Sequence, residues 1–212
     1  MNGGVDDSFI QAHTAQINLA DGTPIVVRPL RPSDRDRLIE AFERTSSHTR
    51  FLRFLRSVDR LSDKELGHLM DVDHRDRAAW VAVDPVTGDG LGIARYARDP
   101  LAPDTAEAAM AVVDDHQRKG IGHVLLRLLT ETAISNGIKS FSAYVLGENR
   151  KVVEALSAAG ATFIRDGTAL KMEVAVPIDD TLFADSALVH TLRAAARGDL
   201  QPLPDPPVDF KA

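Results

Sequence analysis

The sequence predicts a single domain of mixed α+β structure. After an initial hairpin come three helical stretches, and then a run of short strands follows. One further helix stands after the central strand and another after the next strand. The chain has 212 residues, which is enough for one domain with a full core. Its 44% hydrophobic and 26% charged residues are the proportions of an ordinary globular protein.

The first third of the chain predicts a hairpin followed by three helices. Residues 1–14 show no clear period, so we expect a flexible arm there. Strands over 15–19 and 23–30 flank an Asp-Gly pair, which is typical of a hairpin turn. Ser33 with Asp36, and Ser62 with Glu65, have the spacing of capping boxes that begin helices. Between them lies a helical stretch over about 47–56.

The rest of the chain predicts strands, two amphipathic helices and a last helix. The expected strands cover 78–84, 91–98, 105–113, 138–145, 161–165 and 169–176, and the expected helices cover 122–136, 149–159 and 185–197. We therefore expect one domain over 15–178 and a C-terminal helical extension over 179–200. The final segment, 201–212, contains four prolines and is expected to be a disordered tail.

Composition excludes several classes of function. The net charge of −6 argues against general nucleic-acid binding, which needs a basic face. The absence of cysteine excludes disulfides, thiolate metal sites and a cysteine nucleophile. The seven histidines show no metal-ligand spacing, so we expect no metal. There is no signal peptide pattern and no apolar stretch near the roughly 20 residues that span a bilayer, so we expect a cytoplasmic protein without a membrane partner.

The segment over 117–123 carries the clearest chemical signal. A strand runs into a turn with Gly120 and Gly122 and then directly into a long amphipathic helix. The free N–H groups at the positive end of a helix bind phosphate, and glycine lets a ligand approach the backbone. The alternative is a tight turn that simply requires glycine. Nearby side chains that can add positive charge are Arg118, Lys119 and His123.

Other phosphate-binding motifs do not fit this segment. The dinucleotide pattern Gly-x-Gly-x-x-Gly would need glycine where Leu125 stands. Neither a Walker A loop nor the Gly-x-Ser-x-Gly elbow of hydrolases occurs in the chain. Instead, Gln117-x-x-Gly120-x-Gly122 resembles the pyrophosphate loop of the GNAT acetyltransferase superfamily, and the order of elements over about 15–176 is similar as well.

This resemblance implies a GNAT fold, with a mixed central sheet of about seven strands flanked by about four helices. It also implies an enzyme that moves an acetyl group from acetyl-CoA to a primary amine by direct attack in a ternary complex. The opening Val26 to Asp34 and the position of Glu107 look most like bacterial protein lysine acetyltransferases.

The resemblance assigns roles in cofactor binding to individual residues. The backbone from Gln117 to Gly122 would hold the CoA pyrophosphate, and Val112 and Val113 would pair with pantetheine as if it were an added strand. Asn149 would bond the pantetheine arm, although a helix N-cap alone would explain it. The full set of expected cofactor-binding residues is Val112, Val113, Gln117, Arg118, Lys119, Gly120, Ile121, Gly122, His123 and Asn149.

Attack on a thioester requires a neutral amine, whereas an alkylamine is mostly protonated at pH 7, so a base is needed. Glu107 lies where many family members carry that base, and we expect the apolar residues around it to desolvate it: Ala106, Ala108, Ala109 and Met110. An exposed strand acid is the alternative, and Glu40 and Glu43 are the other candidates for the base. The position of the family's usual tyrosine holds Leu156, so the general acid is unassigned; Tyr96 and Tyr144 do not match it.

The acceptor is expected to be a protein lysine, with a small amine, or a CoA-binding regulatory module with little turnover, as alternatives. The early helices are short, which disfavours an enclosed aromatic pocket. Acids along the Glu107 strand and its loops can attract a cation: Asp99, Asp104, Asp114 and Asp115. Arginines at helical spacing predict a solvated face or, alternatively, a site for an acidic ligand: Arg50, Arg53, Arg56 and Arg60. The last helix is compatible with a monomer or a homodimer.

Overall fold

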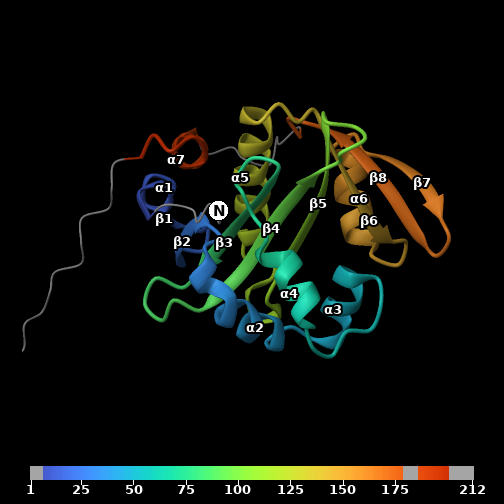
Figure 1. The fold of residues 1–212 in the computed structure, drawn as a ribbon, viewed down its shortest axis with the longest axis horizontal. Coiled ribbons are helices and arrows are strands. Elements are labelled where there is room, and N and C mark those ends of the chain that lie inside the picture. Colours follow the sequence, from blue (N-terminus) through green and yellow to red (C-terminus); the bar gives the residue numbers. More distant parts are fainter. Residues whose placement is uncertain (1–6, 179–185, 201–212) are drawn as a thin grey trace, which may run out of the picture.

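The computed structural model describes residues 7–178 and 186–200. Its centre is one mixed sheet of eight strands in the order β1-β2-β3-β4-β5-β6-β8-β7 (Figure 1). This agrees with the eight strands expected from the residue pattern and is one more than the family resemblance implied. The strands are β1 (Ala15–Asn18), β2 (Pro24–Pro29), β3 (Arg77–Val83), β4 (Gly90–Arg98), β5 (Thr105–Val112), β6 (Ser140–Leu146), β7 (Thr162–Asp166) and β8 (Ala169–Ala175). All neighbouring strands pair antiparallel except β5 and β6, which are parallel.

The helices follow the sequence expectation closely, with one addition. They are α1 (Asp7–Ala12), α2 (Arg35–Glu43), α3 (Ser47–Phe54), α4 (Asp63–Met70), α5 (Ile121–Ser135), α6 (Arg150–Ala158) and α7 (Ser186–Arg197). The addition is α1, which lies within the segment expected to be a flexible arm. Its six residues are too few to show a helical period, yet Ile10 is buried.

Helices cover both faces of the sheet (Figure 1). The strand β3 shows this most clearly, because its residues alternate between two cores. Trp80 belongs to the core that includes α5 and α7, and its indole Nε1 donates to Thr132 Oγ1 at 2.9 Å. Val81 belongs to a smaller core on the face that carries α4. The strand is therefore buried on both sides and lies at the centre of the molecule.

One of the two expected capping boxes forms. At α4, Ser62 Oγ accepts from the Glu65 amide at 3.3 Å, and Glu65 Oε2 accepts from the Ser62 amide at 2.8 Å. Ser33 and Asp36 make no such box at α2, because the neighbouring Asp34 organises that turn instead. Asp34 is buried and accepts two bonds from Arg28, at 2.6 and 2.7 Å.

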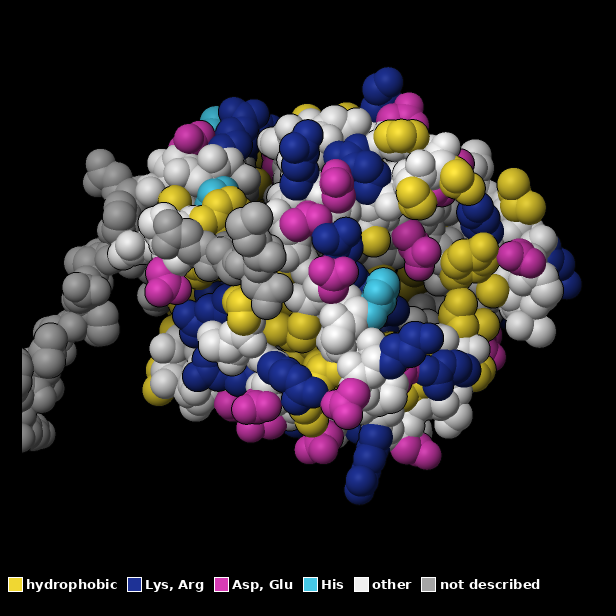
Figure 2. Space-filling model, in the orientation of Figure 1, with side chains coloured by type: hydrophobic (Ala, Val, Ile, Leu, Met, Phe, Trp, Pro, Cys, Tyr) yellow, Lys and Arg dark blue, Asp and Glu magenta, His cyan; other side chains and the backbone are white. Residues whose placement is uncertain are grey.

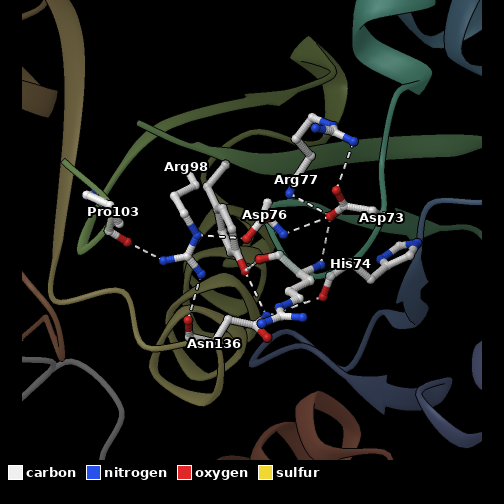
Figure 3. Close-up of polar contacts among 9 residues, drawn as sticks. Asp73, His74, Asp76, Arg77, Arg98, Pro103 and Asn136 are labelled. Atoms are coloured by element: carbon white, nitrogen blue, oxygen red, sulfur yellow. Dashed lines mark hydrogen bonds and ion pairs between the residues drawn. The ribbon is translucent and has the colours of Figure 1, made fainter. Parts of the chain in front are cut away.

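A polar network fixes the end of the sheet where β5 begins (Figure 3). Asp73 Oδ1 accepts from three of the backbone amides that follow it, at 2.8 to 2.9 Å. Arg98 donates to Asp76 Oδ1 at 2.8 Å, to the Asn136 carbonyl at 2.7 Å and to the Pro103 carbonyl. These bonds tie the loop after α4, the loop before β5 and the end of α5 together.

The C-terminal extension contributes α7, which packs against α5 and β1. Leu192 of this helix is fully buried in the main core. The tail expected over 201–212 and the segment 179–185 lie outside the described residues. Within the described residues, no helix is long and apolar enough to span a bilayer.

Candidate active site

The parallel strands β5 and β6 pair over a short distance and then part. Their ladder has three residue pairs, from Thr105 with Ser140 to Glu107 with Ser142. On its other side β5 stays paired with β4 as far as Val112, which lies opposite Gly92. Residues 108–112 therefore form an edge of β5 that faces β6 without pairing to it. We call this segment the unpaired β5 edge.

Strand alternation determines which backbone groups this edge offers. The Val113 amide donates to the Leu91 carbonyl at 3.0 Å, so it points toward β4. Because alternate residues point to opposite neighbours, the groups facing away from β4 are those of Ala108, Met110 and Val112. The Val113 N–H group is therefore already bonded to β4, so the expectation that Val113 pairs with pantetheine is wrong as far as this group is concerned. Alternation along the predicted strand would have indicated Ala108 and Met110 instead.

The turn after β5 exposes a row of backbone donors at the beginning of α5. Arg118 and Gly120 both have positive φ, at 63° and 97°. The amides of residues 118–122 donate no backbone hydrogen bond within the described residues, and the Val124 amide donates to the Gly120 carbonyl at 3.1 Å. Such a row at the positive end of a 15-residue helix fits a pyrophosphate group.

The side chain of Gln117 fastens this turn to its surroundings. Its Nε2 donates to the Val112 carbonyl at 3.2 Å, to Asp114 Oδ1 at 2.9 Å and to Thr49 Oγ1 at 3.2 Å. Asp114 in turn accepts from the Ser46 amide and from the Thr49 hydroxyl, each at 2.5 Å. Burial alone would raise the pKa of Asp114, but the bonds from Thr49 and Ser46 outweigh it and lower the pKa. The turn is thus attached to the beginning of α3.

The remaining residues expected to bind the cofactor occupy different environments. Ile121 is 1% exposed in the core, so only its backbone can contact a ligand. Arg118 and His123 are exposed, and Lys119 is half-buried. Asn149 is half-buried at the beginning of α6, three residues beyond the end of β6. Its side chain makes no capping hydrogen bond, so the N-cap alternative does not account for it.

Glu107 lies at the point where β5 leaves β6, but its environment differs from the expected one. The carboxylate-bearing side chain is exposed rather than desolvated. Ala106 and Ala108 cannot cover it, because successive strand residues point to opposite faces and these two belong to the α5 core. Glu107 faces the other side of the sheet, where α3 packs against β5 and β6.

The two tyrosines differ in their access to this region. Tyr96 is fully buried, and its hydroxyl donates to the Arg75 carbonyl and accepts from Asn136 Nδ2, both at 2.9 Å. Burial raises the pKa of Tyr96 to about 12, so it is unsuited to proton transfer at Glu107. Tyr144 is 40% exposed on β6, two residues beyond Ser142. Leu156, at the position of the family's usual tyrosine, packs against the core.

A hollow lies between strands β2–β5 and helices α2–α4, beside the Glu107 face. We call it the helix-side hollow; including space open to solvent, its empty volume is about 870 Å³. Phe42, Phe54, Val81 and Ile93 line it. Two phenylalanines from α2 and α3 meet here, with ring centroids 5.9 Å apart, although the hollow is open to solvent and is not the enclosed aromatic pocket that the short helices were expected to disfavour.

The acids expected to attract a cation do not gather at one place. Asp104 lies before the beginning of β5 and Asp114 beyond its end, which separates them by roughly 25 Å along an extended strand. Asp104 lies 3.6 Å from Lys139 Nζ, and Asp114 is engaged at the turn. Proximity in sequence was misleading because the strand is extended.

Comparison with known proteins agrees with this geometry. Residues 38–160 match the model of the acetyltransferase (GNAT) family. The chain is 31% identical over 182 residues to acetyltransferase Pat of Mycolicibacterium smegmatis, covering 85% of this chain and 54% of that protein. An acetyltransferase of Pseudomonas aeruginosa is 34% identical over 151 residues, which covers 70% of this chain and 81% of that protein.

A solved structure gives the same result. The GNAT domain of S. lividans PAT superimposes with a TM-score of 0.69 at 30% identity, covering 77% of this chain and 97% of that domain. The chain spans about half the length of the M. smegmatis relative. The cosubstrate of the family is acetyl-CoA, which suits the unpaired β5 edge and the turn before α5. The fold, the site and the sequence comparisons together show that this chain belongs to the GNAT acetyltransferase family.

Proposed function

We propose that this GNAT protein transfers the acetyl group of acetyl-CoA to the side-chain amine of a protein lysine in the cytoplasm. The observation that carries the proposal is the exposed position of Glu107 at the point where β5 and β6 part. A lysine on the surface of another protein can reach such a carboxylate from outside. The similarity to acetyltransferase Pat over 85% of the chain supports acetyl transfer as the reaction.

In this proposal, the turn and the unpaired β5 edge hold the cosubstrate. The amides of residues 118–122 bind the pyrophosphate, and the outward groups of Ala108, Met110 and Val112 pair with the pantetheine arm. Asn149 contributes an amide side chain from the β6 side. A pantetheine arm bound along this edge brings the thioester toward Glu107 at its inner end.

The chemistry follows from that placement. Glu107 accepts a proton from the lysine ammonium, directly or through one water. The neutral nitrogen attacks the thioester carbonyl carbon, the C–N bond forms, and the C–S bond breaks as the electron pair leaves on sulfur. The second amine proton passes to water as the tetrahedral centre collapses, and the CoA thiolate is protonated from solvent or by Tyr144.

A small amine is the second candidate acceptor, and the helix-side hollow is the observation that favours it. Its aromatic and aliphatic lining can hold a compact apolar group beside Glu107. A regulatory module that binds CoA without turnover has no comparable support among the described residues.

One experiment separates the acceptors. The protein is incubated with acetyl-CoA and a cell lysate freed of small molecules, and acetyl-lysine is mapped by mass spectrometry. Thiol release is measured in parallel with a metabolite extract. Protein sites that gain acetylation above a Glu107→Gln control support the proposal. Thiol release with metabolites but without new acetyl-lysine would show that the acceptor is small.

A further inference from the structure

Arg95 is a buried cation without adequate partners. It lies on β4 and lines the helix-side hollow, and only 6% of its surface is exposed. Its Nε and Nη2 atoms have no hydrogen-bond partner among the described residues. A buried guanidinium destabilises a fold unless an anion neutralises it and accepts its hydrogen bonds. Its presence therefore indicates that something else completes the site.

Arg53 brings a second guanidinium to the same hollow. It is half-buried on α3 and lines the hollow together with Arg95. Within the described residues it forms no hydrogen bond or ion pair, and its one recorded side-chain contact is with the ring of Phe54, 5.1 Å from the centroid. Burial and, to a lesser extent, the charge of Arg95 lower the pKa of Arg53 to about 10, while Glu107 opposes the shift.

Nearby arginines on α3 and after it behave differently from Arg53. Arg50 stacks over Phe42 and donates to the carbonyls of Glu43 and Asp59, at 3.1 Å each. Arg56 pairs with Glu65. The expected solvated face holds for Arg56 but not for Arg50 and Arg53, which are half-buried. Figure 2 shows basic side chains gathered over α3. Of the three, Arg53 is the one that lines the hollow and forms no hydrogen bond or ion pair among the described residues, whereas Arg50 lines it but is bonded to two carbonyls.

The acids nearest to these two guanidiniums are engaged elsewhere or exposed. Asp34 is bonded by Arg28, and Asp71 lies 3.2 Å from Arg77 Nε. Glu107 acts on both guanidiniums through its charge but forms no ion pair with either within the described residues. Among the described residues, Glu107 is thus the one exposed carboxylate that acts on both Arg53 and Arg95, and Arg37 and Arg50 line the same hollow, so positive charge is in excess there.

We propose that Arg53 and Arg95 form a subsite for a carboxylate carried by the substrate, on either the acceptor amine or the acyl group. Arg95 lies opposite Ala109 on the neighbouring strand, diagonal to Glu107 on the same face. Diagonal strand neighbours lie about 7–8 Å apart, so the carboxylate sits a few bonds from the reacting atoms. The apolar lining of the hollow suits the methylene groups between them.

This inference rests on the proposed function for its catalytic part, but its binding part can be tested alone. The probe is glutarate, with the neutral glutaramide as a matched ligand of the same length. Thermal unfolding is followed for the wild type, Arg95→Met and Arg37→Met, the last being an exposed arginine that lines the same hollow. Glutarate should raise the Tm of the wild type and of Arg37→Met, but not of Arg95→Met, and glutaramide should raise none.

The stability of the unliganded variant gives a second readout. Arg95→Met should have a higher Tm than the wild type, because it removes a buried cation that lacks partners. A residue that only supports the fold would lower the Tm when replaced. A lower Tm together with an unchanged response to glutarate would overturn the proposal.

The catalytic part identifies where the carboxylate resides. One arm compares acetyl-CoA with succinyl-CoA on a single acceptor, and the other compares amines with and without a carboxylate on acetyl-CoA. If the subsite binds the acyl group, the first comparison should respond to Arg95→Met, and if it binds the acceptor, the second should respond. In the comparison that responds, Arg95→Met should lower kcat/KM for the carboxylate-bearing substrate about 10-fold or more and leave kcat/KM for its neutral counterpart unchanged. Arg53→Lys keeps the positive charge, so it should retain part of the preference for the carboxylate-bearing substrate over the neutral one. If Arg95→Met changes kcat/KM in neither comparison and glutarate does not bind, no such subsite exists. If Glu107→Gln stays active while glutarate binds, the subsite stands and only the proposed role of Glu107 fails.

Discussion

Glu107 and Ser142 form the last residue pair of the parallel ladder between β5 and β6. Beyond this pair β5 keeps its antiparallel partner on one side and has an unpaired edge on the other. The carboxylate therefore stands at the inner end of an edge that can accept an extended ligand. The first prediction depends directly on this placement.

Glu107→Gln should lower kcat by roughly 10²–10⁴-fold, the usual contribution of a general base, and leave acetyl-CoA affinity nearly unchanged. The loss should shrink as pH rises, because more of the acceptor amine is then neutral without assistance. Initial rates from pH 6 to 10 with calorimetry of acetyl-CoA binding measure both effects. Glu43→Gln, an exposed acid on α2, is the matched control. Wild-type turnover of Glu107→Gln at pH 7 would place the base elsewhere.

The two glycines of the turn should differ in their tolerance of alanine. Gly120 has a φ of 97°, where a side chain is strained, so Gly120→Ala should distort the turn and weaken acetyl-CoA binding. A Cβ at Gly122 would meet the side chains of Met110 and Val112 at 3.4 to 3.9 Å, which is ordinary contact, so Gly122→Ala should bind nearly as the wild type does. Either glycine replaced by glutamate should abolish binding through repulsion of the pyrophosphate. Calorimetry on folded variants measures this, and equal affinities for all four would remove the phosphate assignment.

Asp114 should control cosubstrate affinity without contacting the cosubstrate. Asp114→Ala removes the acceptor for Ser46, Thr49 and Gln117, so the turn loses its attachment to α3 and acetyl-CoA should bind more weakly. The pKa of Asp114 is lowered in the fold, so its contribution is present above the unfolded value and is lost as pH falls through the lower, folded value. Affinity measured from pH 7 down to pH 3 should decline below about pH 4. Asp115→Ala, exposed at the next position, should have little effect.

The buried pair of Arg28 and Asp34 should dominate the acid sensitivity of the fold. Their side chains are 6% and 5% exposed, so Asp34→Ala leaves an uncompensated buried charge and should cost about 3–5 kcal/mol of unfolding free energy. The exposed pair of Arg35 and Asp63 is the control, and Asp63→Ala should cost about 0–1 kcal/mol. Burial raises the pKa of Asp34, but the bonds from Arg28 and Arg31 outweigh it and the pKa is lowered. The stabilisation that Asp34 contributes is therefore lost below about pH 4. In that range, the free energy of unfolding measured with urea should change less with pH for Asp34→Ala than for the wild type.

Much of the fold could be predicted from the sequence because local signals agree with the packing. The Ser62 and Glu65 box marks the beginning of α4 as expected. The apolar period of α5 identifies its buried face, and Gly137 follows its end with a positive φ of 75°. The short helix α1 was missed, since six residues carry too little pattern and its burial depends on distant partners.

The cofactor side of the site was predictable, but the acceptor side was not. Gly120 and the amides around it follow from a local motif that fixes backbone shape. The position of Arg95 in the same hollow as Arg53 depends instead on how α3 packs against the sheet at β5 and β6, which is a tertiary relationship without a local signature. The expected desolvation of Glu107 was avoidable in part, since alternation along the strand already places Ala106 and Ala108 on the opposite face.

The short ladder between β5 and β6 also has a consequence for how the molecule holds together. Three residue pairs join the two parts of the sheet, which are strands β1 to β5 on one side and strands β6, β8 and β7 on the other. A ligand bound along the unpaired β5 edge would add backbone bonds where the sheet has none. The two parts of the sheet would then open and close less independently, so that the cosubstrate acts as a structural link as well as a reactant.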